Sequence, residues 1–236
     1  MAQTDMLTCP MQHQRNSDFT LSKSDNPDEI YNEFSNLRSK CPAAWCSENG
    51  GFWMLTRYAD IKRAAFDNGT FISSVKAVVP SDPRGVRRPP LNTDPPAHTP
   101  YRRALDRTLK PARLERLRPA LEAHARREFS KLVERGSGNV ATEFGAIFAA
   151  WVEVTWLNLS SETAPRLATT SAAWVNAWRE QNKEKTVFHS NELYDIARAL
   201  FSDRRQAPRD PEQDPASSLL LERGADGQQL TEELLM

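Results

Sequence analysis

A histidine and an arginine stand four residues apart, at His98 and Arg102, directly after a loop that ends in two prolines. The pattern predicts a helix from about Ala97 to Leu109, and residues four apart lie on the same face of a helix. The N-terminus of a helix favours an anion through its free N–H groups and its dipole. The two side chains therefore predict a site for a carboxylate or a phosphate. The alternative is an exposed pair on a solvated face, since such pairs are common and weak.

The residues around this pair favour a specific site. Residues 94–103 read DPPAHTPYRR, which resembles the start of the C helix in soluble cytochrome P450 enzymes, the haem-thiolate monooxygenases. In that family the His and the Arg four residues later hold a haem propionate, so the resemblance assigns this role to His98 and Arg102. Ala97 stands where the family usually has Glu, a departure that should not affect propionate binding.

Further motifs extend the resemblance over nearly the whole chain. Cys41-Pro42, residues 51–61 (GFWMLTRYADI) and residues 71–74 (FISS) look like the family's first strand and B helix, and residues 117–121 (LRPAL) look like the opening of its D helix. Each motif is loose alone, but their order and spacing argue against chance agreement. The resemblance implies a mainly α fold with a small β element, the N-terminal part of the cytochrome P450 fold.

The motifs that complete such an enzyme are missing from this sequence. The family's iron ligand is a cysteine in an FxxGxxxCxG loop, and none of Cys9, Cys41 and Cys46 has that setting. The ExxR pair of the K helix and the acid–Thr pair of the I helix are absent too. A helix start at residues 231–233 is followed by about one turn, which cannot offset the cost of nucleation. We therefore expect an N-terminal fragment that ends where the I helix begins and has no monooxygenase activity alone.

Composition is that of a soluble globular protein. The 236 residues include 31 basic and 31 acidic side chains, and 39% of them are hydrophobic. Residues 1–16 have no apolar stretch typical of a signal peptide, and no run approaches the ~18 apolar residues of a membrane helix. An odd number of cysteines without an export signal indicates reduced thiols. We expect a cytoplasmic protein, with a flexible tail at 1–25 and a partial domain at 26–236.

Hydrophobic spacing, caps and breakers predict the elements. The predicted strand covers residues 53–56, and the predicted helices cover residues 26–39, 58–67, 97–109, 118–135, 146–159, 161–181, 191–205 and 216–223. Pro119 is tolerable only in a first turn. The helix at 146–159 is apolar nearly all round, so we expect it to be buried. Residues 182–185 should form an exposed connection. Asp214 and Pro215 indicate an N-cap and a first helical proline for the last helix, and Gly224 should end it.

Residues 75–93 should be irregular, because seven of the sixteen prolines fall between Pro80 and Pro100. In the family this B–C loop roofs the substrate pocket, and the F and G helices, here 161–181 and 191–205, open and close over the substrate channel. The weak candidates for pocket walls are Val75, Ala77, Val78 and Val79, and a plain surface loop is the alternative.

Three interpretations compete for a dense basic region. Its members are Arg102, Arg103, Arg107, Lys110, Arg113, Arg116, Arg118, Arg126 and Arg127. Nucleic-acid binding is one interpretation, but interleaved acids and the lack of any recognised DNA-binding motif argue against it. A solvated face is the second. The third follows from the resemblance, whose C helix helps to dock an acidic electron donor, and it points to Arg103 and Arg107.

The isolated aromatic and histidine residues favour structural roles over chemistry. Trp151 and Trp156 fit a core better than a cofactor contact, His124 fits a structural position within a helix, and His189 should be exposed.

The resemblance also implies the cofactor and partners. These are haem b, a small apolar substrate, O2, and a redox protein that donates two electrons, with no nucleic acid and no membrane partner. The main alternative is a non-catalytic helical module that binds an anion or another ligand.

Overall fold

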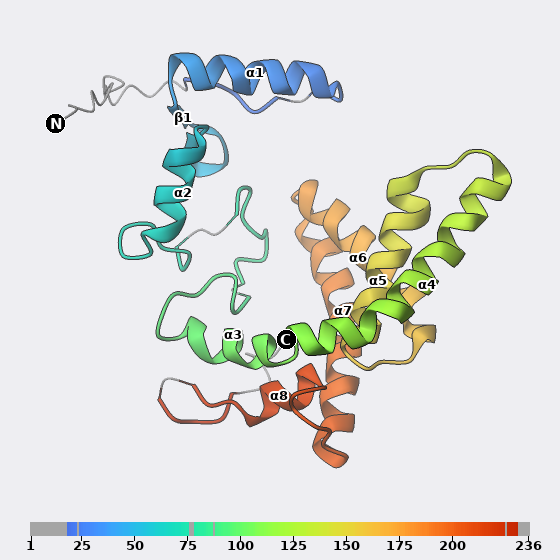
Figure 1. The fold of residues 1–236 in the computed structure, drawn as a ribbon. Coiled ribbons are helices and arrows are strands. Elements are labelled where there is room, and N and C mark those ends of the chain that lie inside the picture. The colour runs from blue at the N-terminus through green and yellow to red at the C-terminus, as the bar shows by residue number, and fades with distance from the viewer. Residues whose placement is uncertain (1–17, 23, 76–77, 87, 225, 231–236) are drawn as a thin grey trace. The chain divides into compact units, whose positions relative to one another are not determined.

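The computed structural model describes residues 18–230 except 23, 76, 77, 87 and 225. Cys9, Ala77 and the helix start predicted at 231–233 therefore lie outside the described residues. The chain divides into two compact units, one of residues 1–72 with 78–81 and one of residues 73–77 with 82–236. Helices predominate in both, as predicted (Figure 1).

The first unit contains two helices and the small β element. Helix α1 (Pro27–Lys40) begins at Asn26, whose side chain accepts a hydrogen bond from the Asp28 N–H at 3.0 Å. Strands β1 (Ala43–Cys46) and β2 (Phe52–Leu55) pair antiparallel, with Trp45 opposite Trp53. A short 3₁₀ turn, η1 (Glu48–Gly50), joins them, and α2 (Tyr58–Phe66) follows.

Two contacts fix this sheet locally. Gly51 has φ +87°, and a Cβ there would lie 2.5 Å from the Trp45 ring, so the turn requires glycine. Asp18 accepts a hydrogen bond from the Trp45 N–H at 2.8 Å. The described end of the predicted tail is thus bonded to β1.

The second unit is helical throughout its regular part. Its helices are α3 (His98–Arg107), α4 (Pro111–Arg135), α5 (Ala146–Trp156), α6 (Ala164–Arg179), α7 (Lys183–Gln206) and α8 (Pro215–Leu221), with a π-helical turn η2 (Val140–Gly145) and a 3₁₀ turn η3 (Ser161–Thr163). The expected lack of regular structure at 75–93 is confirmed for the described residues there.

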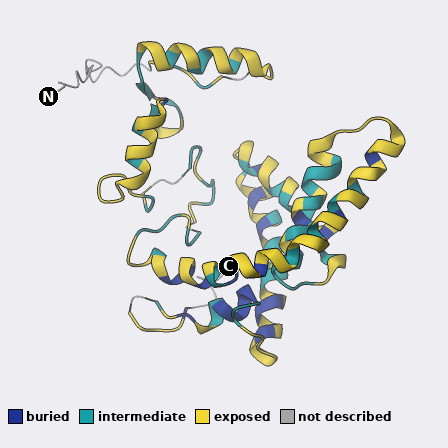
Figure 2. Ribbon diagram, in the orientation of Figure 1, coloured by how far each residue is buried: buried dark blue, intermediate teal, exposed yellow. Residues whose placement is uncertain are grey.

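The core of the second unit lies among α5, α6, α7 and α8. One cluster of buried side chains joins α5 to α6 through Val154 and Leu167, and a second joins α7 to α8 through Phe201 and Ala216. Figure 2 shows α8 as largely buried. Asp214 caps α8 by accepting from the Ser217 N–H at 2.8 Å, and Pro215 takes the first helical position, as predicted.

Two helix starts differ from the prediction. Helix α4 begins at Pro111 rather than residue 118, so Pro119 lies inside the helix and not in its first turn. Pro119 is exposed, so water can reach the backbone groups that its ring leaves unpaired. Helix α7 begins at Lys183, with Asn182 as its cap, so residues 183–185 are helical and do not form the predicted connection.

Two further predictions were wrong in detail. Only Ala150 and Val154 of α5 are buried, and Ile147 is 42% exposed, so this apolar helix is not enclosed on all sides. Helix α8 ends at Leu221 with Glu222 as its cap. Gly224 instead donates its N–H to the Gln228 carbonyl at 2.8 Å, beside a short bridge between Arg223 and Gln229.

Candidate functional site

The entrance to α3 is held by Asp94. One carboxylate oxygen accepts from the Ser73 N–H at 2.8 Å, and the other accepts from the Ser74 N–H at 2.9 Å. The Asp94 carbonyl accepts from the His98 N–H at 3.0 Å. Hydrogen bonds from Ser74 and Ser73 hold the pKa of Asp94 below its ordinary value. Asp94 therefore remains ionised and positions the helix start, a role that sequence reasoning missed.

His98 and Arg102 both line one open cleft along α3, which fits the prediction that they share a helix face. His98 is half-buried, while the Arg102 side chain is 56% exposed and its Nε lies 2.9 Å from Asp106 Oδ1. The other residues that line the cleft are Thr99, Arg103, Asp106, Arg107 and Lys110. This donor set of one imidazole, several cationic groups and a single carboxylate suits a bound carboxylate group. The chemistry of the cleft therefore fits a haem propionate.

Residues in α8 and on either side of it neutralise part of the cleft. Arg107 donates to Ser218 Oγ at 3.3 Å and forms an ion pair with Glu222. Arg103 lies 3.8 Å from the same carboxylate and stays 60% exposed, and Lys110 pairs with Glu212. Of the two residues predicted to meet an electron donor, Arg103 is the one whose side chain is mostly exposed.

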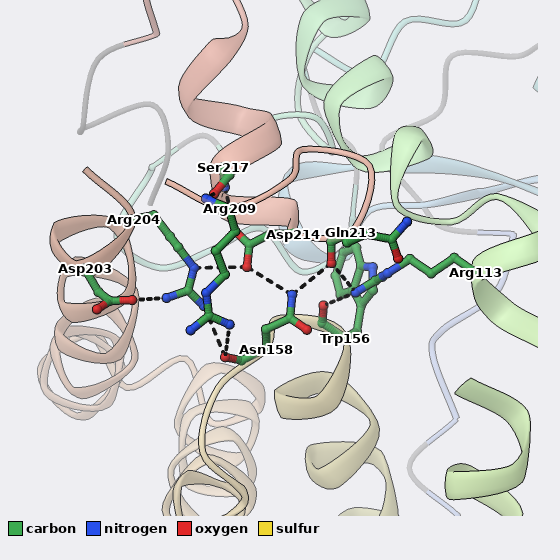
Figure 3. A network of polar contacts seen from close by, with 9 residues as sticks. All are labelled: Arg113, Trp156, Asn158, Asp203, Arg204, Arg209, Gln213, Asp214 and Ser217. Carbon is green, nitrogen blue, oxygen red and sulfur yellow. Dashed lines mark hydrogen bonds and ion pairs between the residues drawn. The ribbon is translucent and has the colours of Figure 1, made fainter. Parts of the chain in front are cut away.

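A buried polar network holds the second unit together around α8 (Figure 3). Arg113, only 4% exposed, donates to the carbonyls of Thr108, Trp156 and Gln213 at 2.7–2.9 Å. Its burial lowers its pKa. Arg113 is thus a structural residue. It does not belong to a basic surface, as its inclusion in the predicted basic region had suggested.

The other half of this network centres on Asp214. Its Oδ2 accepts from Arg204 Nε and from Asn158 Nδ2, both at 3.0 Å, and the Asp214 side chain is fully buried. Arg204 also donates to the Asn158 carbonyl at 3.1 Å. The network therefore joins α4, the end of α5, α7 and α8. It fixes α8, against which α3 packs.

An apolar cavity of about 350 Å³ lies in the second unit. Its wall includes Leu105 of α3, Trp156 of α5, several residues of α6 and α7, and Leu219 of α8. Two arginines of the irregular loop, Arg84 and Arg88, complete it. Mostly apolar walls with a few polar groups are typical of small-molecule sites.

The described residues among the predicted pocket walls, Val75, Val78 and Val79, do not line this cavity. Val75 is 79% exposed and is not part of its wall, and Val78 and Val79 belong to the first unit. The hydrophobic character of these valines suggested a pocket wall. The loop reaches the cavity instead through two charged residues, whose contacts with α6 and α7 no local pattern reveals.

The predicted structural residues lie in packed positions. Trp151 packs against the core cluster of α5 and α6 and stacks on His124, with ring centroids 3.9 Å apart. Trp156 donates its indole N–H to Thr108 Oγ1 at 3.1 Å and also lines the cavity. His189, predicted to be exposed, is only partly so and lies 3.0 Å from Glu192.

Acids accompany much of the predicted basic region. Arg118 pairs with Glu115 at 2.6 Å, and Arg126 pairs with Glu122 at 3.2 Å. Such pairs are typical of a solvated helix face. Within the described part of the chain, no helix is long and apolar enough to cross a membrane, and no cluster of three His, Cys, Asp or Glu side chains could hold a metal ion.

The chain is similar to known proteins in both sequence and fold. No protein-family model matches the chain. The chain is 28% identical over 124 residues to the steroid C26-monooxygenase of Mycobacterium tuberculosis, a match that covers 45% of this chain and 29% of that relative. It is 36% identical over 115 residues to cytochrome P450 CYP199A2 of Rhodopseudomonas palustris, covering 47% of this chain and 27% of the relative.

The fold is similar to solved cytochrome P450 structures. The Mycobacterium marinum cytochrome P450 CYP268A2, solved in complex with pseudoionone, aligns with a TM-score of 0.73 and 21% sequence identity, over 89% of this chain and 55% of that one. The chain thus spans about half the length of this structure. The predicted fold class is confirmed: it is the N-terminal part of the cytochrome P450 fold.

Proposed function

We propose that this chain, whose sequence and fold are those of the N-terminal part of a cytochrome P450, supplies one side of a haem site and one side of a substrate site in a haem-thiolate monooxygenase. The observation that carries the proposal is the basic cleft on α3, which His98 and Arg102 line. Haem b, when bound, would supply the chemistry that activates O2 and transfers one oxygen atom to a small apolar substrate.

His98 and Arg102 would hold a haem propionate in this proposal. The imidazole N–H and the guanidinium can both donate to a carboxylate, and the arginine offers a planar pair of donors. Asp94 acts as a positioning residue, because its hydrogen bonds to Ser73 and Ser74 fix the backbone from which His98 starts. Asp106 keeps Arg102 along the helix until the carboxylate binds.

The partners follow from the same proposal. An acidic redox protein would deliver two electrons to the face of α3 where Arg103 is exposed. The apolar cavity of about 350 Å³, whose wall includes Leu105 of α3, would take the substrate. The cysteine that ligates iron is not among Cys9, Cys41 and Cys46, and we propose that a segment outside this sequence provides it. Among the described residues neither Cys41 nor Cys46 forms a disulfide, and the Cys41 thiol donates to the Ala43 carbonyl at 3.1 Å, which fits a cytoplasmic protein.

The decisive test is a reduced, carbon-monoxide-bound absorption spectrum of the full-length, haem-supplied protein. A Soret band shifted far to the red, as a thiolate ligand produces, is the expected result. A soluble sample without that band would contradict the proposal and favour a non-catalytic helical module that binds a ligand.

The propionate roles are tested separately by haem content. His98→Ala and Arg102→Ala should each lower the haem occupancy of the purified full-length protein several-fold, roughly the loss of one charge-assisted hydrogen bond. Arg126→Ala is the matched control, because its side chain is 80% exposed and lies outside the cleft. Occupancy equal to that of the parent in both cleft variants would refute the assignment.

A further inference from the structure

Two arginines of the irregular loop attach it to two different helices at the wall of the apolar cavity. Arg84 donates to the Tyr194 hydroxyl of α7 at 3.0 Å, and the Arg88 guanidinium lies over the Trp174 ring of α6 at 4.8 Å. All four residues line the cavity. We call residues 82–86 and 88–92, which carry the two arginines, the strap. One side of the cavity wall is thus held in place by these two contacts.

The part of the strap that reaches α7 is fixed by contacts within the strap itself. The Asp82 carboxylate accepts from the Arg84 backbone N–H at 2.9 Å, from its Nε at 3.0 Å and from its Nη2 at 2.8 Å. Both side chains are less than a tenth exposed, and the Asp82 carbonyl accepts from the Gly85 N–H at 3.0 Å. Burial alone would raise the pKa of Asp82, but the hydrogen bonds from Arg84 hold it below the ordinary value. These bonds join residues two or three apart, so the local shape does not depend on the helices.

The contacts between the strap and the helices are weaker than those within it. Arg84 meets one neutral hydroxyl on α7, and Arg88 meets an aromatic face on α6. A neutral acceptor and a ring each hold a guanidinium less firmly than a carboxylate that accepts from two of its nitrogens. Leaving a buried carboxylate unpaired is costly, so the Asp82–Arg84 pair should stay together when the outer contacts break.

We propose that the strap is a gate to the cavity that opens as a preformed unit. It leaves α6 and α7 by breaking the Arg88–Trp174 and Arg84–Tyr194 contacts, and the Asp82–Arg84 pair moves with it. The Tyr194 hydroxyl is the latch, because it accepts the hydrogen bond that opening breaks. The inference rests on the proposed function only in treating this cavity as the place that a small molecule enters.

The accessibility of a thiol placed in the cavity measures how often the gate opens. Ser190 is 2% exposed, lines the cavity and lies four residues before Tyr194 on α7. Ser190→Cys in the full-length protein introduces a thiol there with little change in size. Mass spectrometry of the peptide that contains residue 190 follows its alkylation by iodoacetamide separately from that of the native cysteines. When opening and closing are fast relative to alkylation, the rate is proportional to the open population.

Tyr194→Phe removes the latch but keeps the ring that the Arg84 and Arg198 guanidinium groups face at 5.8 and 5.9 Å. It should raise the alkylation rate at position 190 about tenfold, the effect of losing one hydrogen bond to a charged group. Tyr31→Phe is the matched control, because Tyr31 is 71% exposed on α1, and it should leave the rate unchanged. Trp174→Leu removes the ring beneath Arg88 and should raise the rate roughly threefold or more. It keeps the test valid if Tyr194→Phe fails to fold.

Two further readouts separate the opening of a gate from a general loosening. Thr186→Cys places a thiol on the same helix at a fully buried position that does not line the cavity, and Tyr194→Phe should not change its alkylation rate. The amides of Arg84 and Gly85 should exchange with deuterium equally fast in Tyr194→Phe and in the parent, because their hydrogen bonds lie within the strap.

Three results would overturn the proposal. They are an unchanged alkylation rate at position 190 in both Tyr194→Phe and Trp174→Leu, an equal acceleration at position 186, and faster exchange of the Arg84 and Gly85 amides. The last result would mean that the strap unfolds and does not open as a unit. None of these readouts needs haem or substrate, so their failure is distinct from an absent thiolate Soret band.

Discussion

Arg103 and Arg107 lie one helical turn apart on α3 but differ in their surroundings. The Arg107 side chain is 27% exposed and is bonded to Ser218 and to Glu222, whose side chain is 6% exposed. Arg103 is 60% exposed and lies 3.8 Å from Glu222. An unpaired buried carboxylate is costly, whereas an exposed ion pair contributes little. Arg107 therefore stabilises the fold, and Arg103 is available for a partner.

This difference predicts effects of unequal size for two similar substitutions. Arg107→Gln should lower the free energy of unfolding by about 2 kcal/mol, because it leaves Glu222 with a weaker partner. Arg103→Gln should change it by about 0.5 kcal/mol or less. Urea denaturation followed by circular dichroism measures both values. A larger loss for Arg103→Gln would show that the structural roles are reversed.

His124 is a buried side chain whose surroundings disfavour the charged imidazole. It is 5% exposed, stacks on Trp151 at an angle of 8°, and has an Nε2 without a hydrogen-bond partner among the described residues. Burial lowers the pKa of His124, the nearby Arg127 lowers it further, and Glu128 acts in the opposite direction. The folded state therefore favours the neutral imidazole.

The lowered pKa predicts a loss of stability in mild acid. The unfolded chain takes up a proton near the ordinary pKa of about 6.5, whereas the folded chain takes it up only at lower pH. Stability should be complete above about pH 6.5 and should decline as the pH falls toward the folded-state pKa. His124→Phe keeps a flat ring against Trp151 and should lose this component, which urea titrations at about pH 7.5 and about pH 5 can measure. An unchanged pH dependence in the variant would contradict the prediction.

Among the elements, those with local start signals were predictable. Asp214 caps α8 as predicted, and Asn26 caps α1 where the predicted helix begins, because a cap is a contact over two or three residues. The start of α4 was missed although Pro111 is a good first residue. Because proline is best tolerated in a first turn, the predicted start was placed next to Pro119. The start of α7 was missed because residues 183–190 carry few apolar residues of clear period. Tertiary contacts determine where the helix begins in such segments.

The Asp214 network joins four of these elements through a charge that is fully buried. Asp214→Asn keeps the shape but removes the carboxylate that Arg204 faces, and the Arg204 side chain is 3% exposed. We expect the free energy of unfolding to fall by about 3 kcal/mol, the cost of breaking a buried pair. Thermal unfolding compares it with Asp195→Asn, which removes an exposed acid of α7 paired with Arg198. A loss of equal size in the control would show that burial is not the cause.

The same carboxylate gives a second, independent readout. Burial would raise the pKa of Asp214, but hydrogen bonds from Asn158, Ser217 and Arg204 outweigh it and hold the pKa below the ordinary value. The stability that Asp214 provides should be complete above about pH 4 and should be lost as the pH falls through the folded-state pKa below it. The Asp214→Asn variant should lack this acid-dependent component.

Across the whole molecule, burial is unevenly divided between the two units. Neither α1 nor α2 contains a buried residue, whereas the two core clusters lie among α5, α6, α7 and α8. Regions with few buried apolar contacts open with low free energies. We expect the amides of α1 and α2 to exchange with deuterium at least about tenfold faster than those in the middle of α6 and α7. Mass spectrometry resolves these segments, and uniform protection would contradict the prediction.

The sequence distance between contacting residues explains how much of the site could be predicted. His98 and Arg102 are four residues apart on one helix, so spacing alone predicted that they share a face, and the structure adds that this face borders a cleft. Asp94 acts on backbone about twenty residues away, and Arg84 reaches Tyr194 across 110 residues. No local period reports such contacts. They become visible only when the helices have packed.

The buried Arg113 has a consequence for the order in which the chain matures during synthesis. Its guanidinium donates to a carbonyl 43 residues away, at Trp156, and to another 100 residues away, at Gln213. When Arg113 leaves the ribosome, neither acceptor has yet emerged, and the charge has to remain in water. The helices can form early, but the second unit cannot close until residue 213 has emerged. A nascent chain stalled before that point would expose the apolar faces of α5 and α6, which makes it a natural client for a chaperone.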